Sequence, residues 1–202
     1  MGRVRKGLIW AALVIAIAIP IGASATSPLL AWRDPIYIAA GFAGVIAMTL
    51  LLVQPLLVAG YLPGLSGPRG RQVHRWIGAG LVFFVAIHVT ALWITSPPDV
   101  IDALLFASPT PFSAWGVMAM WAVFAAAIVA ANRRRLKLKP RTWRRLHTAL
   151  SVVVVVGSVV HAMLIEGTME TISKAALCVL VITAAVKALA DLRVWAIRLP
   201  SR

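Results

Sequence analysis

Residues 143–165 read WRRLHTALSVVVVVGSVVHAMLI, a stretch long enough to cross a membrane as one helix. It contains two histidines, His147 and His161. The chain has only two other histidines, His74 and His88, and they lie in a second apolar stretch. The two histidines of each stretch are fourteen residues apart, and the offset between the stretches is 73 for both pairs. All four histidines therefore belong to one regular pattern.

A spacing of fourteen residues places two side chains on nearly the same face of a helix, about 21 Å apart along its axis. If the two helices are parallel neighbours, His74 faces His147 at one depth and His88 faces His161 at another. Imidazole is a common axial ligand of haem iron, and helical bundles hold cofactors between facing helices. The pattern predicts two haems stacked across a membrane. The alternative, histidines that serve only packing, is weaker for His88 and His161, which lie deep in apolar sequence.

The composition is that of an integral membrane protein. Of the 202 residues, 61% are hydrophobic. The net charge of +14 does not indicate a nucleic-acid partner, because the basic residues lie between the apolar stretches and at their ends. The single cysteine, Cys178, excludes a disulfide or a thiolate metal cluster within one chain.

Hydropathy predicts an all-α bundle of six membrane-spanning helices, forming one transmembrane domain over residues 1–202. The predicted spans are about residues 8–25, 36–62, 76–95, 115–131, 146–165 and 172–195. Basic segments 69–75 and 133–145 are expected in the cytoplasm, and segment 96–112, which has no Lys or Arg, on the other side. Both termini are therefore predicted to be cytoplasmic. The third and fifth spans are predicted to be parallel, with the haem sites between them.

Local signals in other segments lead to further expectations. Residues 1–25 fit a retained first helix or a cleaved signal peptide, and the helix is favoured because further spans follow at once. The sequence VIDALLF, residues 100–106, predicts a short helix at the membrane interface. Segment 133–145 is either a topology anchor or a docking surface for an acidic partner or anionic lipid. Lys187 and Asp191 are expected to pair along the last helix.

Arginines and glycines flank the predicted haem positions. The arginines beside the cytoplasmic-side ligands are Arg71, Arg75, Arg144 and Arg145. Arginine pairs well with carboxylates, so some of the four are predicted to bind haem propionates; solvated charges that fix the topology are the alternative. Gly78, Gly80 and Gly157 permit either close approach of a porphyrin or close packing of helices.

Many other function classes lack their sequence signals. No carboxylate lies deep in a span, which disfavours a pump or a proton-coupled transporter. The sequence has no HExxH motif, no P-loop and no serine-nucleophile elbow. It also has no GxGxxG fingerprint or soluble extension, so no flavin or nicotinamide site is expected in this chain.

Two segments carry a resemblance to a known family. GRQVHRWIG (residues 70–78) and RRLHTALS (residues 144–151) each contain the first histidine of a helix, and the second follows fourteen residues on. The chain resembles, over about residues 36–195, the ferric reductase-like transmembrane domain. That domain is the six-helix haem core shared by ferric reductases, NADPH oxidases and the membrane subunit of the bacterial periplasmic methionine sulfoxide reductase system. The resemblance implies that the four histidines are b-type haem ligands in a transmembrane electron-transfer protein.

The resemblance also implies partners and a location. The protein would be an oxidoreductase component without its own flavin or NADPH domain, in a bacterial inner membrane. Electrons would come from a cytoplasmic flavoprotein reductase or from membrane quinol. They would pass to an extracytoplasmic acceptor, which could be ferric iron, oxygen or a redox protein. Two haems b are expected, and occupancy by one alone stays open.

Two alternative functions follow from the same residues. In the first, the chain is a haem-binding, quinol-fed membrane subunit of a two-component periplasmic reductase. In the second, it is a non-redox membrane scaffold or transporter whose histidines bind a metal ion or nothing. The absorption spectrum distinguishes the scaffold or transporter from the haem-binding functions, because a protein without haem has no Soret band.

Overall fold

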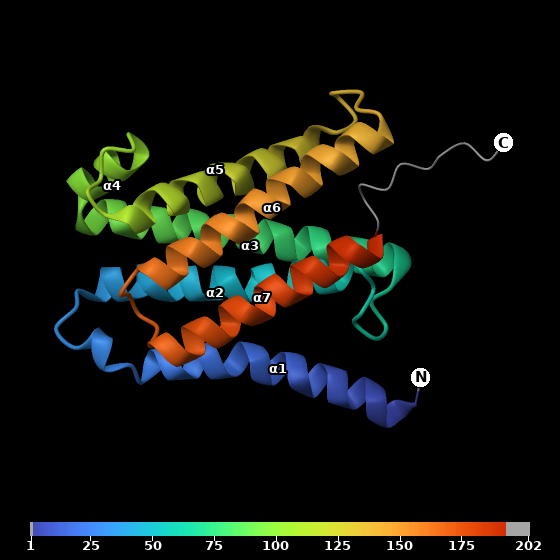
Figure 1. The fold of residues 1–202 in the computed structure, drawn as a ribbon, viewed down its shortest axis with the longest axis horizontal. Helices are drawn as coiled ribbons and strands as arrows, with labels where there is room; N and C mark the ends of the chain where they lie inside the picture. Colours follow the sequence, from blue (N-terminus) through green and yellow to red (C-terminus); the bar gives the residue numbers. More distant parts are fainter. Residues whose placement is uncertain (1, 193–202) are drawn as a thin grey trace.

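The protein is a bundle of long helices joined by short connections (Figure 1). The computed structural model describes residues 2–192. The helices are α1 (Arg3–Ala25), α2 (Pro35–Val58), α3 (Gly67–Thr95), α4 (Pro97–Leu104), α5 (Pro111–Asn132), α6 (Pro140–Leu164) and α7 (Thr171–Leu192), with a short 3-10 helix η1 (Pro28–Leu30). All except α4 and η1 are long and apolar enough to cross a membrane, and the described residues contain no strand. The predicted all-helical class and six spans are confirmed.

Proline and polar residues mark where helices begin. The side chain of Asp34 caps α2, because its Oδ1 atom accepts a hydrogen bond from the Ile36 backbone N at 2.7 Å. Pro35 occupies the first helical position, where the missing N–H would have no partner in any case. Helices α5 and α6 also begin at a proline, Pro111 and Pro140, but without a side-chain cap.

The helix ends differ from the hydropathy-based spans. Helix α2 ends at Val58 rather than at 62, and the chain turns at Gly60, whose φ of 73° suits glycine. Helix α3 begins at Gly67 rather than at 76, and α6 begins at Pro140 rather than at 146. Hydropathy detects only the apolar part of a helix, whereas α3 and α6 continue into the basic segments. The predicted short helix is present as α4, and its place at a membrane interface stays a prediction.

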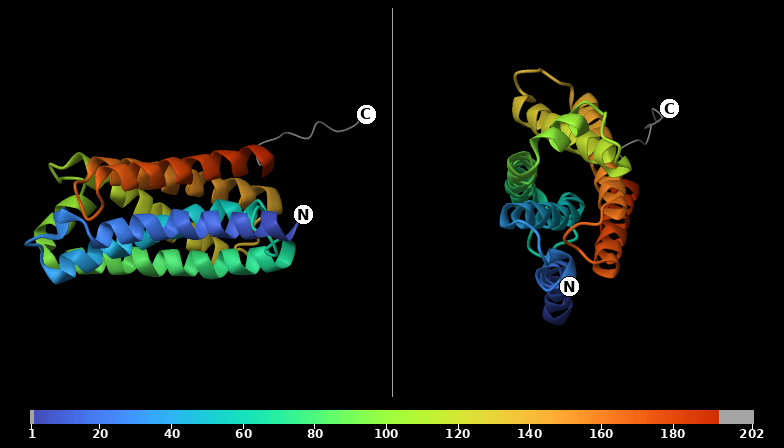
Figure 2. Two further views of the ribbon diagram at one scale, coloured as in Figure 1. Left: turned by 90° about the horizontal axis from the view of Figure 1, so that it is seen from below. Right: turned by 90° about the vertical axis from the view of Figure 1, so that its left-hand side faces the viewer.

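Helices pack in two close pairs, α2 with α3 and α5 with α6. Helix α7 lies across α2 and α6, and α1 lies at the margin against α2 and α7 (Figure 2). A buried stripe of α7, which includes Leu177 and Val181, forms part of the main hydrophobic core together with Leu81 of α3 and Val154 of α6. The backbones of α3 and α6 do not pack closely against each other. The two helices that carry the histidines are therefore joined through side chains rather than through a tight backbone contact.

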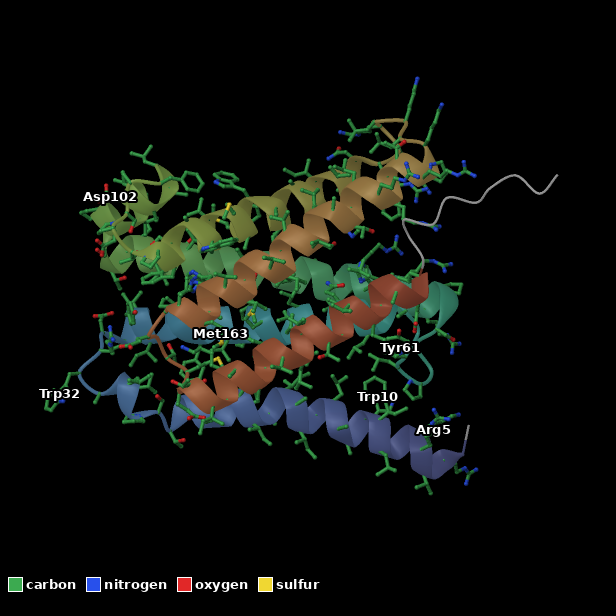
Figure 3. The ribbon with its side chains drawn as sticks, in the orientation of Figure 1. Arg5, Trp10, Trp32, Tyr61, Asp102 and Met163 are labelled. Carbon is green, nitrogen blue, oxygen red and sulfur yellow. The ribbon has the colours of Figure 1, made fainter. Side chains whose placement is uncertain are left out.

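The two ends of the bundle differ in charge. Arg5 and Tyr61 lie at one end, and Trp32 and Asp102 lie at the other (Figure 3). The first, called the basic end here, holds both arginine-rich segments, 69–75 and 133–145. The second, called the acidic end, holds every Asp and Glu of the sequence except one. The exception is Asp191. Its carboxylate pairs with Lys187 Nζ at 3.0 Å, as the four-residue spacing predicted.

Candidate functional site

Two pairs of histidines face each other between α3 and α6. The ring centroids of His74 and His147 are 6.3 Å apart, with planes at 76°. Those of His88 and His161 are 6.4 Å apart, with planes at 82°. The structure places all four sequence-predicted histidines in two facing pairs at two depths, and this requires α3 and α6 to run in the same direction.

Backbone carbonyls hold the two histidines nearer the acidic end. His88 Nδ1 donates to the Ala40 carbonyl of α2 at 2.7 Å, and His161 Nδ1 donates to the Phe112 carbonyl of α5 at 2.9 Å. A carbonyl oxygen only accepts, so in each neutral ring Nδ1 carries the proton and Nε2 keeps its lone pair. A second ring nitrogen bonded to a carbonyl is the usual way in which metal-binding histidines are oriented.

Both of these rings rest against glycines that the sequence reasoning missed. A Cβ at Gly116 would lie 2.7 Å from His161 Nδ1, and a Cβ at Gly44 would lie 3.2 Å from His88 Nδ1. Each glycine is one helical turn after the residue whose carbonyl binds the ring, so α2 and α5 each present an acceptor and a gap together. One sequence signal marks these residues: Ala40 and Gly44 of α2 lie 72 residues before Phe112 and Gly116 of α5.

The pair nearer the basic end is held differently. The Nδ1 atoms of His74 and His147 are buried and have no hydrogen-bond partner within residues 2–192. Two neighbours also have buried, unpartnered atoms: Gln54 Oε1, whose amide nitrogen donates to the His74 carbonyl at 3.3 Å, and Trp143 Nε1. The Trp143 ring stacks on His147 with centroids 5.5 Å and planes 8° apart, and the Arg133 guanidinium lies 4.4 Å over Trp143. Unsatisfied polar atoms therefore gather at this pair.

The separation of the rings fits a shared metal atom better than direct contact. A bond from imidazole nitrogen to a metal is about 2 Å, and a ring nitrogen lies about 1 Å from the ring centre, so two rings sharing a metal have centroids about 6 Å apart. Both pairs have this separation. Residues 2–192 contain no group of three or more His, Cys, Asp or Glu that could hold a bare metal ion. A metal here needs further ligands, such as the nitrogens of a porphyrin.

The four predicted arginines lie at the basic end, with exposed side chains that form no ion pair in the described part of the chain. Arg71 and Arg144 each precede a histidine of the basic-end pair by three residues, so each shares a helix face with that histidine. Arg75 follows its histidine by one residue and Arg145 precedes its histidine by two, which turns them away by about 100° and about 160°. The helix geometry therefore separates the four arginines into two that share the helix face of a histidine and two that do not.

Three glycines near the predicted haem positions, Gly78, Gly80 and Gly157, lie against neighbouring helices. A Cβ at Gly78 would lie 3.1 Å from Gln54 Nε2, and a Cβ at Gly157 would lie 3.0 Å from Ala119 Cβ. Gly80 likewise faces a side chain of α2. Because these neighbours belong to α2 and α5, the glycines bring the helices of each close pair together.

Comparison with known proteins adds a family to this geometry. The family model described as "Ferric reductase like transmembrane component" matches residues 40–158, more than half of the chain. The matched range begins at the residue whose carbonyl binds His88 and contains three of the four histidines, while His161 lies three residues beyond its end. No curated protein and no solved structure matches the chain. The match and the six apolar helices together identify an integral membrane protein.

Proposed function

The chain belongs to the ferric reductase-like transmembrane family, as the resemblance of its histidine segments predicted, and we propose that it is a b-type di-haem protein that carries electrons across the membrane. The family is a membrane electron-transfer component, which implies redox partners. The observation that carries the di-haem proposal is the equal separation of the two histidine pairs, 6.3 and 6.4 Å. His74 and His147 hold the basic-end haem, and His88 and His161 hold the acidic-end haem.

A bound haem supplies a one-electron carrier, because its iron alternates between the ferric and ferrous states. The residues of this chain hold and shield the two positions. The carbonyls that accept from His88 and His161 fix the two rings and leave each Nε2 atom free to bind iron. Leu81 and Val154 lie seven residues from each histidine of their helix, and both are buried. They form an apolar layer between the two depths that excludes water.

The charged ends support a direction for the electrons. The basic end is the cytoplasmic side, because Lys and Arg accumulate in cytoplasmic loops. Electrons enter there, from a cytoplasmic flavoprotein reductase or from membrane quinol, and leave at the acidic end. The acceptor is ferric iron, oxygen or a redox protein outside the cytoplasm. In this proposal the protein lies in a bacterial inner membrane with both termini in the cytoplasm.

Arginine side chains bind the propionates of the basic-end haem. Arg71 and Arg144 are the favoured pair, because they share a helix face with His74 and His147 and have the same offset of 73. A guanidinium matches a carboxylate with two parallel hydrogen bonds. The buried Nε1–H of Trp143 is a further donor without a partner at this position.

The first experiment is a dithionite-reduced minus air-oxidised spectrum of the purified protein, with haem quantified per chain. We expect two haems b in the wild type and one in His161→Ala and in His147→Ala. Thr95→Ala is the matched control, since its hydroxyl bonds only to carbonyls of its own helix, and it should keep both haems.

The other results separate the alternatives. One haem per wild-type chain would favour the quinol-fed subunit of a two-component reductase. A colourless protein, made with ample haem, would leave the scaffold or transporter. Two haems in the wild type and unchanged haem content in His161→Ala would overturn the pairing of ligands and leave electron transfer in place.

A further inference from the structure

Lys174, in the first turn of α7, is a buried cation near the acidic end. The residue is 7% exposed. It lies with Ser173 at the start of the buried stripe of α7, which continues through Leu177, Cys178 and Val181. Its Nζ atom donates one hydrogen bond, to the Ile165 carbonyl at 2.8 Å, and this leaves most of its donors unused.

No carboxylate of the described chain neutralises this charge. Lys174 forms no ion pair within residues 2–192. Glu170, one turn earlier in the sequence, uses its Oε1 atom to accept from the Ser173 backbone N at 3.0 Å. A buried charge without a counter-ion is strongly unfavourable, and a buried ionisable side chain in a membrane protein marks a site whose partner has to be identified. Lys174 therefore needs an anion that the described residues do not supply.

The cation lies where the end of α6, which carries His161, meets the start of α2, whose Ala40 carbonyl binds His88. Ile165 follows α6, and its backbone N–H donates to the His161 carbonyl at 3.1 Å. Ile165 therefore lies one helical turn beyond His161, about 6 Å along the helix axis. The loop after Ile165 packs on α2, where a Cβ at Gly41 would overlap the Thr168 hydroxyl. Ala40, the residue before Gly41, is the one whose carbonyl binds His88, the other histidine of the pair.

We propose that Lys174 binds a carboxylate of the haem held by His88 and His161, a role that rests on the proposed function. Haem propionates are anions, and an ammonium group beside one would form the charge-assisted bond that the buried side chain lacks. Among residues 2–192, the other basic residue at the acidic end is Arg33, which is exposed and whose guanidinium lies 4.9 Å over the Tyr37 ring. Lys174 is thus the buried cation at this end that is in place to meet the cofactor.

A second role of Lys174 has to be separated from this one. Its hydrogen bond to Ile165 also caps the end of α6, and a cap needs a donor but no charge. Lys174→Gln keeps an N–H donor and removes the charge. Lys174→Arg keeps both, and Lys174→Met removes both. Comparison of the three variants distinguishes binding of an anion from capping.

The test is a redox titration followed at the acidic-end haem, whose spectrum is assigned as the part that His88→Ala loses. A nearby cation stabilises the reduced iron, which carries one positive charge fewer. At the wild-type midpoint potential, Lys174→Gln should lower the ferrous-to-ferric ratio by about threefold to tenfold, where tenfold corresponds to about 59 mV for one electron. In Lys174→Arg this ratio should stay within about twofold of the wild-type value. The midpoint potential of the basic-end haem should be unchanged in each variant. Lys187→Gln, an exposed cation near the other end of α7, is the control and should leave the acidic-end haem unchanged.

Each result is decisive. If Lys174→Gln and Lys174→Met both lose the acidic-end haem while Lys174→Arg keeps it, the requirement for charge also supports the proposal. An unchanged potential in Lys174→Gln, or loss of the haem in Lys174→Arg as well, would assign Lys174 to capping or packing. A wild-type protein that binds no haem would instead overturn the proposed function itself.

Discussion

The indole ring of Trp143 lies parallel to the imidazole ring of His147, with planes 8° apart and centroids 5.5 Å apart. His147 Nδ1 is buried and has no hydrogen-bond partner in the described residues, so this stack is a contact that helps to hold the plane of the ring. His161, on the same helix, is fixed by a hydrogen bond to a carbonyl at 2.9 Å. On one helix, the ring of His147 is therefore stacked on an indole, and the ring of His161 is hydrogen-bonded to a carbonyl.

Removal of the stack should loosen the basic-end site alone. We expect Trp143→Ala to weaken haem binding there by about tenfold, a usual result of removing a contact that orients a metal ligand. Trp143→Phe keeps an aromatic face and should retain most of the binding. Haem content and the low-temperature EPR spectrum of the ferric protein would measure the change, because the spectrum reports the orientation of the ligand rings. Equal spectra for Trp143→Ala and the wild type would rule out the orienting role.

The glycine beneath His161 should tolerate no side chain. In Gly116→Ala the new methyl group would approach Nδ1 to 2.7 Å, so the ring must move and its bond to the carbonyl is strained. We expect loss of the acidic-end haem and a loss of stability of about 1–3 kcal/mol, the range for overpacking a filled site. Gly44→Ala, with 3.2 Å to His88, should do less. Haem content and thermal unfolding in detergent would measure both effects.

Gly22→Ala supplies the control for these glycine variants. Gly22 lies in α1, and a Cβ added there would have no neighbour within 4 Å. It should leave the haem content unchanged and add a little stability, because alanine is the better helix former. Similar losses in Gly22→Ala and Gly116→Ala would show that glycine in a helix, rather than the clash with His161, causes the effect.

The sequence was sufficient to predict the placement of the histidines. Apolar stretches and arginine-rich segments indicated six spans with the third and fifth parallel, and the spacings of fourteen and 73 then indicated which rings face each other. These arguments succeed because both depend on periodicity along helices, which is local. The same arithmetic holds for Arg71 and Arg144, although the offset of 73 alone does not show that they face the site.

The contacts that hold the rings could not be predicted. The carbonyl partner of His161 is 49 residues away in the sequence and belongs to the backbone of Phe112, so no side-chain type marks it. Gly116 and Gly157 look alike in sequence, yet one faces a histidine ring and the other faces a neighbouring helix. Such differences depend on how α5 and α6 are rotated against each other, which hydropathy does not determine.

The cap of α7 should make stability depend on pH. Glu170 Oε1 accepts from the Ser173 backbone N at 3.0 Å, and this hydrogen bond lowers the pKa of Glu170. A carboxylate with a lowered pKa stabilises the fold above its ordinary pKa, and the contribution is lost as the pH falls through its folded-state pKa. Thermal unfolding of the wild type should therefore become easier between about pH 5 and pH 3, and Glu170→Gln should remove part of that dependence. Glu166→Gln, in the same loop, is the control. Identical pH profiles for Glu170→Gln and the wild type would contradict the capping role.

The arginines at the basic end should divide by helix face. Arg71→Gln with Arg144→Gln removes the two guanidinium groups on the faces of the basic-end histidines, and Arg75→Gln with Arg145→Gln removes the same charge from other faces. If the first pair binds propionates, its loss should lower the midpoint potential of the basic-end haem by about 30 to 60 mV, which is about a threefold to tenfold change in the ferrous-to-ferric ratio. The second pair should shift it much less, because charges turned to solvent are screened. Equal shifts in the two double variants would mean that the arginines act only through the overall charge of this end.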